Sequence, residues 1–430
     1  MPRQHYSLGV IGWFIELVLS APCSQRAAAA IVHWMSQLVG GQQAPCANAG
    51  RTWLFRLGLY ELTSPKERAD DWVWLVDHTV QLGSHKGLII VGLRLSDWQS
   101  DPRPLEHRDV RLLHLEPMEH SDGQAVQQEL KKAAAQTGVP RAIVSDGGSD
   151  LKKGVELFRQ AHAATDHVYD ITHKVALLLK KELEADADWE KFISESNLAR
   201  RGLALTAAGF LVPPALKAKA RYMNVDCLVE WGAKVLRFLD QPTAVPGPPL
   251  DQERIEARLG WLRSFRQRLK QWSALLSLAQ TAEHHVRHHG WHAAAGAQWR
   301  AVLAPLATCH ASRRLLDQLL EFAAEQAAKA RPGERLVGST EVLESLIGKY
   351  KYLQSLHSGY GMTRTILALG ALVGRRSLET LRAALGHVTN RQVQDWCQQH
   401  LGLTLQARRH HAFPPEQNQP PLRLGCEPSF

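Results

Sequence analysis

The run Trp72-Val-Trp-Leu-Val-Asp77 decides how the middle of this chain is interpreted. Five consecutive apolar residues, two of them valine and two tryptophan, are typical of a central strand that is buried on both faces of a sheet. The aspartate that follows stands where a strand gives way to a turn. Because Asp favours turns on its own account, this position alone predicts no chemistry.

The residues that follow predict further strands and helices in a specific order. Strands are expected at 87–95, 110–115, 141–145 and 167–171, and helices at 123–137 and 149–162. Three successive strands, then helix, strand, helix and strand, are what a five-stranded mixed ribonuclease-H-like sheet requires. The expected loops are short, as they are in compact α/β units. The sequence therefore predicts the first part of an α/β ribonuclease-H-like core over residues 66–175.

Residues 1–65 are predicted to be all-helical. The third expected helix mixes Arg51 and Arg56 with aromatic residues, which is compatible with a helix-turn-helix region that binds DNA. A small helical cap packed on the next domain is an equally good interpretation, because the loop before this helix is longer than the usual tight turn. The three helices are expected at 7–19, at 25–39 after an N-cap at Ser24, and at 48–58.

Residues 176–335 are predicted to form a large all-helical insertion of five to seven helices. Apolar residues recur at helical spacing throughout, and a proline-rich loop at 240–251 interrupts them. Arg263 and Arg266 alternate with aromatic residues and are candidates for contact with DNA phosphates. Core packing is the default interpretation of the aromatic residues themselves.

After the insertion, residues 336–410 are predicted to complete the core and add C-terminal helices, and residues 411–430 to form a disordered, proline-rich tail. The stretch Gly338–Lys351 predicts a helix with an N-cap at Ser339 or Thr340 and apolar residues along one face.

Three carboxylates are expected to meet. In a sheet whose first and fourth strands are adjacent, Asp77 and Asp146 stand at neighbouring strand ends, where open α/β sheets place their sites. Burying two such carboxylates uncompensated costs several kcal/mol, which a divalent cation offsets. Two Mg²⁺ ions, or Mn²⁺ as a substitute, held roughly 4 Å apart, suit phosphodiester chemistry but need a third carboxylate. Either Glu344 or Glu341, on the helix after the insertion, can supply it.

Three short pieces of the sequence resemble the DDE transposases of bacterial insertion sequences. They are Val76-Asp77-His-Thr79, Val144-Ser-Asp146-Gly147 and Leu343-Glu344-Ser-Leu-Ile-Gly-Lys-Tyr-Lys351. The last resembles the family's signature of a catalytic glutamate, six residues and a lysine. The resemblance implies that Asp77, Asp146 and Glu344 are the metal ligands and catalytic residues. Some relatives have a Tyr and an Arg just upstream of the glutamate, whereas this chain has Thr340 four residues before it.

The resemblance also implies partners and a reaction. Transposon ends would be cleaved and joined to target DNA, so the partner is double-stranded DNA. Pairing two ends implies a homo-oligomer, at least a dimer, and the helical N-terminal region is similar to a module that binds transposon ends. Lys351, and more weakly Lys349, would contact a DNA phosphate. Two rival hypotheses are a ribonuclease-H-like nuclease without strand transfer and a catalytically inactive DNA-binding protein derived from a transposase.

Composition agrees with a DNA partner. The 430 residues carry a formal charge of +9, which favours a polyanion. Six scattered cysteines without a C-x-x-C pair indicate neither a disulfide framework nor a zinc site, and favour a reducing cytoplasm. The resemblance implies that this is a bacterial cytoplasm, with the protein near the nucleoid. No run reaches the ~20 apolar residues that cross a bilayer, so no membrane partner is expected.

Two histidine-containing groups have more than one interpretation. Asp170 and His173, at the end of the fifth expected strand, are either a strand-end cap or a secondary metal ligand or DNA contact. The histidines between His284 and His292 have the four-residue spacing that a metal can bridge on a helix. A basic, DNA-facing or solvated helix is the favoured interpretation there.

Overall fold

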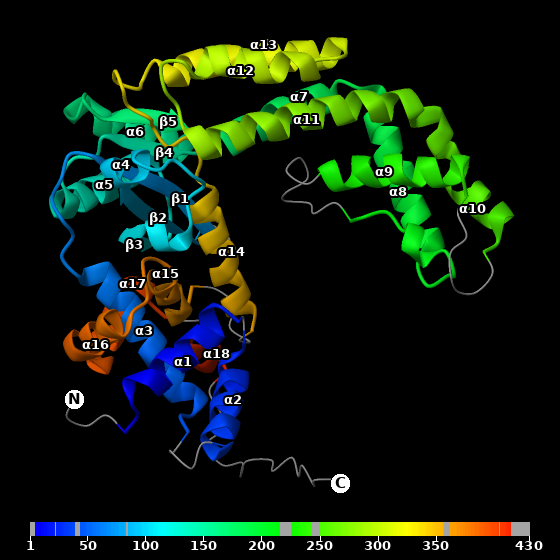
Figure 1. Ribbon diagram of the computed structural model, residues 1–430. Coiled ribbons are helices and arrows are strands. Elements are labelled where there is room, and N and C mark those ends of the chain that lie inside the picture. The colour runs from blue at the N-terminus through cyan, green and yellow to red at the C-terminus, as the bar shows by residue number, and fades with distance from the viewer. Residues whose placement is uncertain are drawn as a thin grey trace, which may run out of the picture.

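The structure, a computed structural model, describes residues 5–21, 23–38, 44–82, 85–215, 225–242, 250–356, 362–403 and 405–413. A five-stranded sheet lies between two groups of helices (Figure 1). One group extends from the sheet as a long arm, and the other, which contains both the first and the last described helices, lies on the opposite side. No helix in the described part of the chain is both long and apolar enough to span a membrane.

The sheet has the order β3-β2-β1-β4-β5. Strand β1 pairs antiparallel with β2 and parallel with β4, so the first and fourth strands are adjacent, as the sequence predicted. Strands β2 and β3 are antiparallel, and β4 and β5 are parallel. The bounds are β1 Trp72–Leu82, β2 His85–Arg94, β3 Arg111–Met118, β4 Ala142–Ser145 and β5 Asp166–Tyr169.

Strand β1 is buried on both faces, as its continuous apolar run predicted. Trp74 and Val76 pack in one hydrophobic cluster with Phe158 of α6, whereas Val73 and Leu75 belong to the larger cluster on the opposite face. Helices α5 (Gly123–Thr137) and α6 (Ser149–Ala161) pack against each other and against the sheet. A short helix, α4 (Leu95–Gln99), follows β2.

The prediction that the first strand ends at Asp77 was wrong on one side. The antiparallel ladder with β2 continues past Asp77, which pairs with Ile89, and β1 extends to Leu82. On the other side, the parallel ladder with β4 stops at the pair Val76 and Ser145. Asp77 therefore lies inside one ladder and one residue beyond the other, so its β4 side is open.

Seven α-helices lie between β5 and the helix that carries Glu344, at the upper limit of the prediction for the described residues. Helix α11 runs the length of the arm, with α8, α9 and α10 at its far end (Figure 1). Aromatic rings of α8 and α11, among them Phe192 and Trp272, pack together there, so these aromatics form a core. The bounds are α7 Ile171–Glu184, α8 Ala187–Leu203, α9 Val225–Asp240, α10 Gln252–Leu259, α11 Arg266–His289, α12 Ala295–Leu303 and α13 His310–Ala327. Residues 243–249 of the expected proline-rich loop lie outside the described part.

The N-terminal helices share one core with the C-terminal helices. Helix α3 packs against α15, α16, α17 and β3. It passes α15 so closely that a Cβ on Gly58 would lie 1.8 Å from the carbonyl oxygen of Leu367, a contact that only glycine permits. The bounds are α1 Leu8–Leu19, α2 Gln25–Leu38, α3 Ala47–Thr63, α15 Ala368–Leu372, α16 Leu378–His387, α17 Asn390–Leu401 and α18 Leu405–Ala412.

This packing changes two expectations. Helix α3 continues past Gly58 to Thr63, and Trp53 and Phe55 are buried, so the aromatic residues of the expected DNA-binding helix belong to the core. The helix-turn-helix interpretation stays a prediction. The expected disordered tail begins too early, because α18 extends to Ala412, and residues 414–430 lie outside the described part.

Helix α14 (Glu341–Ser355) links the two halves of the molecule. It starts beside the sheet, where it contacts β1, and runs toward the N- and C-terminal helices (Figure 1). Thr340 holds the N-cap position without a side-chain hydrogen bond, whereas the Ser339 hydroxyl accepts a 3.2 Å hydrogen bond from the Glu341 backbone N–H. The predicted helix start is therefore confirmed, and Ser339 supplies the hydroxyl.

Candidate functional site

Asp77 and Asp146 stand side by side at the end of the parallel β1–β4 pair. Val76 is paired with Ser145, and each aspartate is the next residue of its strand segment. The Asp77 carboxylate accepts a 2.6 Å hydrogen bond from the His78 backbone N–H. The Asp146 carboxylate accepts one of 2.9 Å from the Gly148 backbone N–H, in the turn before α6. The strand register therefore places both carboxylates at the same end of the two adjacent strands.

The negative charges of Asp146 and Glu344 act on Asp77. Burial and the negative charge of Asp146 raise the pKa of Asp77 to about 7, and the charge of Glu344 acts in the same direction. The His78 N–H and the charge of His173 oppose that rise. Asp77 is thus a partly buried carboxylate near other carboxylates, and its ionised form lacks full compensation.

Glu344 lies in the first turn of α14 and is the third carboxylate near Asp77. Its Oε1 atom lies 3.6 Å from Nδ1 of His173. That oxygen is buried and has no hydrogen-bond partner in the described structure. Burial raises the pKa of Glu344. A buried carboxylate oxygen without a donor is expensive unless something absent from the protein chain itself satisfies it.

Glu341, the competing glutamate, points elsewhere. Its Oε2 atom lies 2.9 Å from Nε of Arg287 in α11, and half of its side chain is exposed. Arg287 also pairs with Glu283 of its own helix at 3.1 Å. Of the two glutamates, Glu344 is therefore the one beside His173 and the aspartates, and Glu341 belongs to an ion-pair network on the arm.

Asp170 connects His173 to the start of α14. It is fully buried and caps α7, where one carboxylate oxygen accepts hydrogen bonds from the backbone N–H and from Nδ1 of His173, at 3.0 and 2.7 Å. The other oxygen accepts a 2.9 Å hydrogen bond from the Thr340 backbone N–H at the start of α14. The strand-end cap that the sequence predicted is therefore present, and it also fixes the start of the helix that carries Glu344.

His173 supplies positive charge among these carboxylates. Burial opposes its protonation, but the hydrogen bond to Asp170 and the charges of Asp170, Glu344 and Asp146 raise the pKa of His173 to about 9. The imidazole is therefore cationic at neutral pH, and it partly compensates the acidic groups that surround it.

The donor set fits a hard divalent cation. Ligand atoms of Asp170, His173 and Glu344 lie within 4.8 Å of one another, whereas no such group among the described residues contains Asp77 or Asp146. Carboxylate oxygens dominate the surroundings, as Mg²⁺ and Mn²⁺ prefer. The unpartnered Oε1 of Glu344 and the raised pKa of Asp77 both indicate negative charge that such a cation would compensate.

The predicted DNA contacts are only partly brought together. Lys349 and Lys351 are exposed on α14, the helix of Glu344, and Lys351 follows Glu344 by two turns. Arg51 is exposed on α3, near its first turn. Arg56 is half-buried and donates to the carbonyl oxygens of Leu385 and Val388, which commits its side chain to the fold.

Arg263 and Arg266 lie on the arm rather than at the carboxylates. Arg263 is paired with Glu256, and Arg266 with Asp240 at 2.7 and 2.8 Å. Both arginines therefore already have acidic partners. The nearby histidines of α11 form close, tilted ring pairs, such as His284 and His288 with ring centroids 3.9 Å apart. No metal-ligating group among the described residues includes them.

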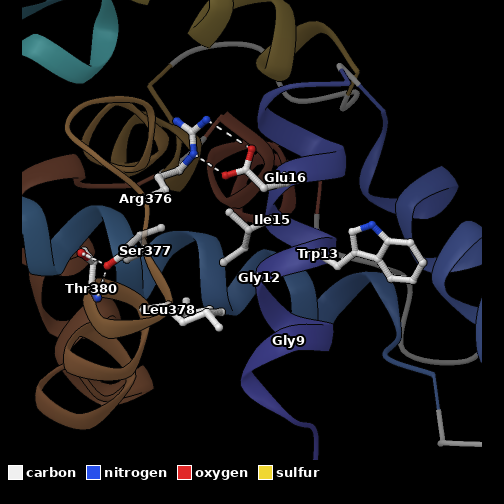
Figure 2. Close-up of a pocket in the computed structure, with 11 residues that line it drawn as sticks. Gly9, Gly12, Trp13, Ile15, Glu16, Arg376, Ser377, Leu378 and Thr380 are labelled. Atoms are coloured by element: carbon white, nitrogen blue, oxygen red, sulfur yellow. Dashed lines mark hydrogen bonds and ion pairs between the residues drawn. The ribbon is translucent and has the colours of Figure 1, made fainter.

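The apolar pocket between α1 and α16, of about 390 Å³, is separate from these groups (Figure 2). Its lining includes Trp13 and Leu378, and the Glu16 carboxylate at its end accepts a 2.7 Å hydrogen bond from Nε of Arg376. That ion pair ties the first helix to the C-terminal helices. The pocket is therefore a feature of helix packing, and the candidate chemistry lies at the sheet.

Sequence reasoning missed several contributors to the site. The link from Asp170 to Thr340 spans the whole insertion, so no local pattern signals it. The pairing of Glu341 with Arg287 also joins distant segments. A second cluster of metal-ligating side chains, His114, Glu116 and Glu129, was not singled out, although the His-x-Glu spacing on a strand places two ligands on one face.

Comparisons with known proteins add a structural neighbour. No protein-family model matches the chain, and no curated protein matches its sequence. Among solved structures, the chain is similar to the Drosophila P element transposase strand transfer complex. The two are 11% identical with a TM-score of 0.43, over 88% of this chain and 94% of that chain.

Proposed function

We propose that this chain is a metal-dependent transposase that acts on double-stranded DNA through a ribonuclease-H-like core. The observation that carries the proposal is the placement of Asp77 and Asp146 at the open end of the β1–β4 pair, with the unpartnered Oε1 of Glu344 facing His173 beside them. The strand order β3-β2-β1-β4-β5 and the helical arm between β5 and α14 support the proposed core.

In this proposal Asp77, Asp146 and Glu344 hold Mg²⁺ or Mn²⁺, as two ions. Bound there, these cations would favour the deprotonated attacking hydroxyl and neutralise charge on the reacting phosphate. Asp170 holds Nδ1 of His173 and the start of α14, so it is a positioning residue. His173 supplies positive charge beside the developing phosphorane, and Lys351 and Lys349 contact the DNA backbone.

Two displacements at phosphorus follow from this arrangement. In the first, water forms a new P–O bond while the bond from phosphorus to the 3′ oxygen of the transposon end breaks, which leaves a 3′-hydroxyl. In the second, that hydroxyl attacks a target phosphodiester in line, and the target's own 3′ oxygen leaves. No covalent bond to the protein forms. Joining two ends implies at least a dimer of this chain.

The test is an assay for cleavage and joining with Mn²⁺. The DNA that flanks the gene is expected to carry inverted repeats bounded by a short target duplication, and duplexes copied from those repeats are the substrate. We expect joined products from the wild type and none from Asp146→Asn. Cleavage without joining would favour a nuclease. Specific binding with no chemistry from the wild type would contradict both enzyme functions and favour a DNA-binding protein.

A further inference from the structure

A second set of side chains that can bind a metal lies at edge strand β3, on the side of the sheet away from β5. His114 and Glu116 are on β3, Glu129 is on α5 and His400 is on α17. Ligand atoms of the first three lie within 4.8 Å of one another. His400 adjoins this group without being within 4.8 Å of all three: its Nδ1 is 3.1 Å from Oε2 of Glu116. The group contains two imidazoles and two carboxylates.

The fold explains why these four residues meet. Residues two apart on a strand point to the same face, so His114 and Glu116 share one face of β3. Helix α5 packs against β3 and brings Glu129 to His114. Strand β3 is at the edge of the sheet, so α17 can pack beside it, and Figure 1 shows α17 next to β3.

The contacts within the group are close, and part of it is buried. Nε2 of His114 lies 2.7 Å from Oε2 of Glu129, and these residues are only 8% and 7% exposed. The other oxygen of Glu129 accepts a 2.9 Å hydrogen bond from Nζ of Lys132. Glu116 and His400 are about one-fifth exposed, at 21% and 22%. A cation could therefore enter from the His400 side.

We propose that His114, Glu116, Glu129 and His400 bind one divalent transition-metal ion, with Zn²⁺ as the best match. Imidazole nitrogen and carboxylate oxygen are ordinary Zn²⁺ ligands, and four protein ligands are typical of a structural tetrahedral site. Two imidazoles disfavour Mg²⁺, which prefers oxygen ligands. On binding, the imidazole nitrogens that face the carboxylates give up any proton to solvent and donate their lone pairs to the metal.

The ion would join three separate parts of the chain. It would link β3 and α5 of the sheet domain to α17, which packs on α3 of the N-terminal region. Its role is therefore structural, and it fixes the terminal helices against the sheet. This site shares no residue with Asp77, Asp146 and Glu344, so it stands or falls independently of the proposed transposase function.

The test measures Zn²⁺ binding to the full chain after removal of metals by a chelator. The Asp77→Asn/Asp146→Asn/Glu344→Gln triple variant is the background, so that the candidate active site loses the carboxylates proposed to hold metal there. We expect about one Zn²⁺ per chain by metal analysis and titration calorimetry, with a higher melting temperature when Zn²⁺ is present. Glu116→Gln and His400→Gln are each expected to weaken Zn²⁺ binding by at least about tenfold.

His387→Gln is the matched control, because His387 is an exposed helical histidine on α16 outside the cluster, and its Zn²⁺ affinity is expected to be unchanged. Far-ultraviolet circular dichroism checks that each variant is folded. If Glu116→Gln does not fold, His400→Gln decides, because His400 lies on α17, outside the sheet. Absence of Zn²⁺ binding in the background protein, or unchanged affinity in His400→Gln, would overturn the proposal.

Discussion

The two ends of strand β4 carry acidic side chains in opposite electrostatic states. At its start, Arg141 donates to Asp166 at 2.6 Å and to both oxygens of Glu334 at 2.7 and 2.5 Å. The Arg141 side chain is 2% exposed, and its Nη2, which donates to Glu334, also donates to the Lys329 carbonyl oxygen. Every carboxylate there has a strong partner.

At the other end, Asp146 stands beside Asp77, whose pKa is raised to about 7 by burial and by Asp146, and the Oε1 atom of Glu344 has no hydrogen-bond partner. The two ends of β4 are only a few residues apart. The segment that follows the helical arm contacts both ends, and it contributes Glu334 to the first end and Glu344, on α14, to the second. One end stabilises the fold, and the other holds negative charge that the fold alone does not compensate. That difference is the signature expected of a cation-binding site.

Breaking the compensated end is expected to have the largest effect on stability. Arg141→Met removes the closest cation from Asp166 and from the mostly buried Glu334. What remains is Arg159, 4.0 Å from Asp166, and the Arg331 backbone N–H, which donates to Glu334. We expect a loss of about 3–5 kcal/mol in the free energy of unfolding, measured by urea denaturation. Arg108→Met, which removes a more exposed ion pair with Glu106, is the control and is expected to cost less than about 1 kcal/mol. Equal losses of stability in Arg141→Met and Arg108→Met would show that the Arg141 ion pairs do not stabilise the fold more than an exposed pair does.

Neutralising Asp77, at the uncompensated end of β4, is expected to stabilise the fold. The folded chain keeps the Asp77 proton up to a pKa of about 7, whereas the unfolded chain loses it near the ordinary value of 3.8. The folded state therefore binds more protons between these values, so the stability contributed by Asp77 falls as pH rises through that window. Without metal at pH 8, Asp77→Asn should raise the free energy of unfolding by about 1–3 kcal/mol.

The same substitution should flatten the pH dependence of stability between pH 4 and 7. Burial also raises the pKa of Glu283 to about 7, so the wild type has a further slope that Asp77→Asn retains. The difference between the two proteins reports the titration of Asp77 together with its coupling to Asp146, Glu344 and His173. Asp101→Asn, at an exposed position, is the control. A variant that is less stable than the wild type at pH 8 would show that the Asp77 carboxylate is already compensated.

The sequence predicted the sheet well because its information is local. The apolar run 72–76 and the alternating helices and strands sufficed to place β1 beside β4, and hence Asp77 beside Asp146. The predicted end of β1 was too early. Asp77 lies beyond the last pair with β4, but its backbone still pairs with β2.

Long-range partners could not be predicted in the same way. The resemblance favoured Glu344, but local patterns left Glu341 as a competitor, and the position of Arg287 on α11 separates the two glutamates. Arg56 looked like a DNA contact because its acceptors, backbone carbonyls of 385 and 388, carry no sequence signal. The same holds for His400, which reaches Glu116 across 284 positions of the chain.

Adding a cation should sharpen the contrast between the two ends. We expect Mn²⁺ at about 100 times its dissociation constant to stabilise the wild type by about 2–3 kcal/mol, because it binds only the folded state. The Asp77→Asn/Asp146→Asn variant should show little of this gain, whereas Asp101→Asn should keep it. Thermal melts with and without Mn²⁺, after Zn²⁺ has been removed, measure the effect. An equal gain in the double variant would place the Mn²⁺ site elsewhere.

The smallest expected effect concerns DNA contacts on α14. Lys351→Ala should weaken binding to end-containing duplexes by about 1 kcal/mol, uniformly across sequences, and reduce the salt dependence of binding by about one phosphate contact. Fluorescence anisotropy over a salt series measures both. Lys234→Ala, on the far part of the arm and paired with Glu230, is the control. An unchanged salt dependence in Lys351→Ala would remove this lysine from the DNA interface.

The central claim is that Glu344, rather than Glu341, completes the site formed by Asp77 and Asp146. The most direct measurement compares Glu344→Gln with Glu341→Gln in the Mn²⁺-dependent joining assay, after circular dichroism has shown that both are folded. Glu344→Gln is expected to lose joined product by at least about a thousandfold, or roughly 4 kcal/mol of barrier, and Glu341→Gln to stay within about tenfold of wild type. Joining by Glu344→Gln at near wild-type rates, or loss of joining in Glu341→Gln alone, would contradict the account.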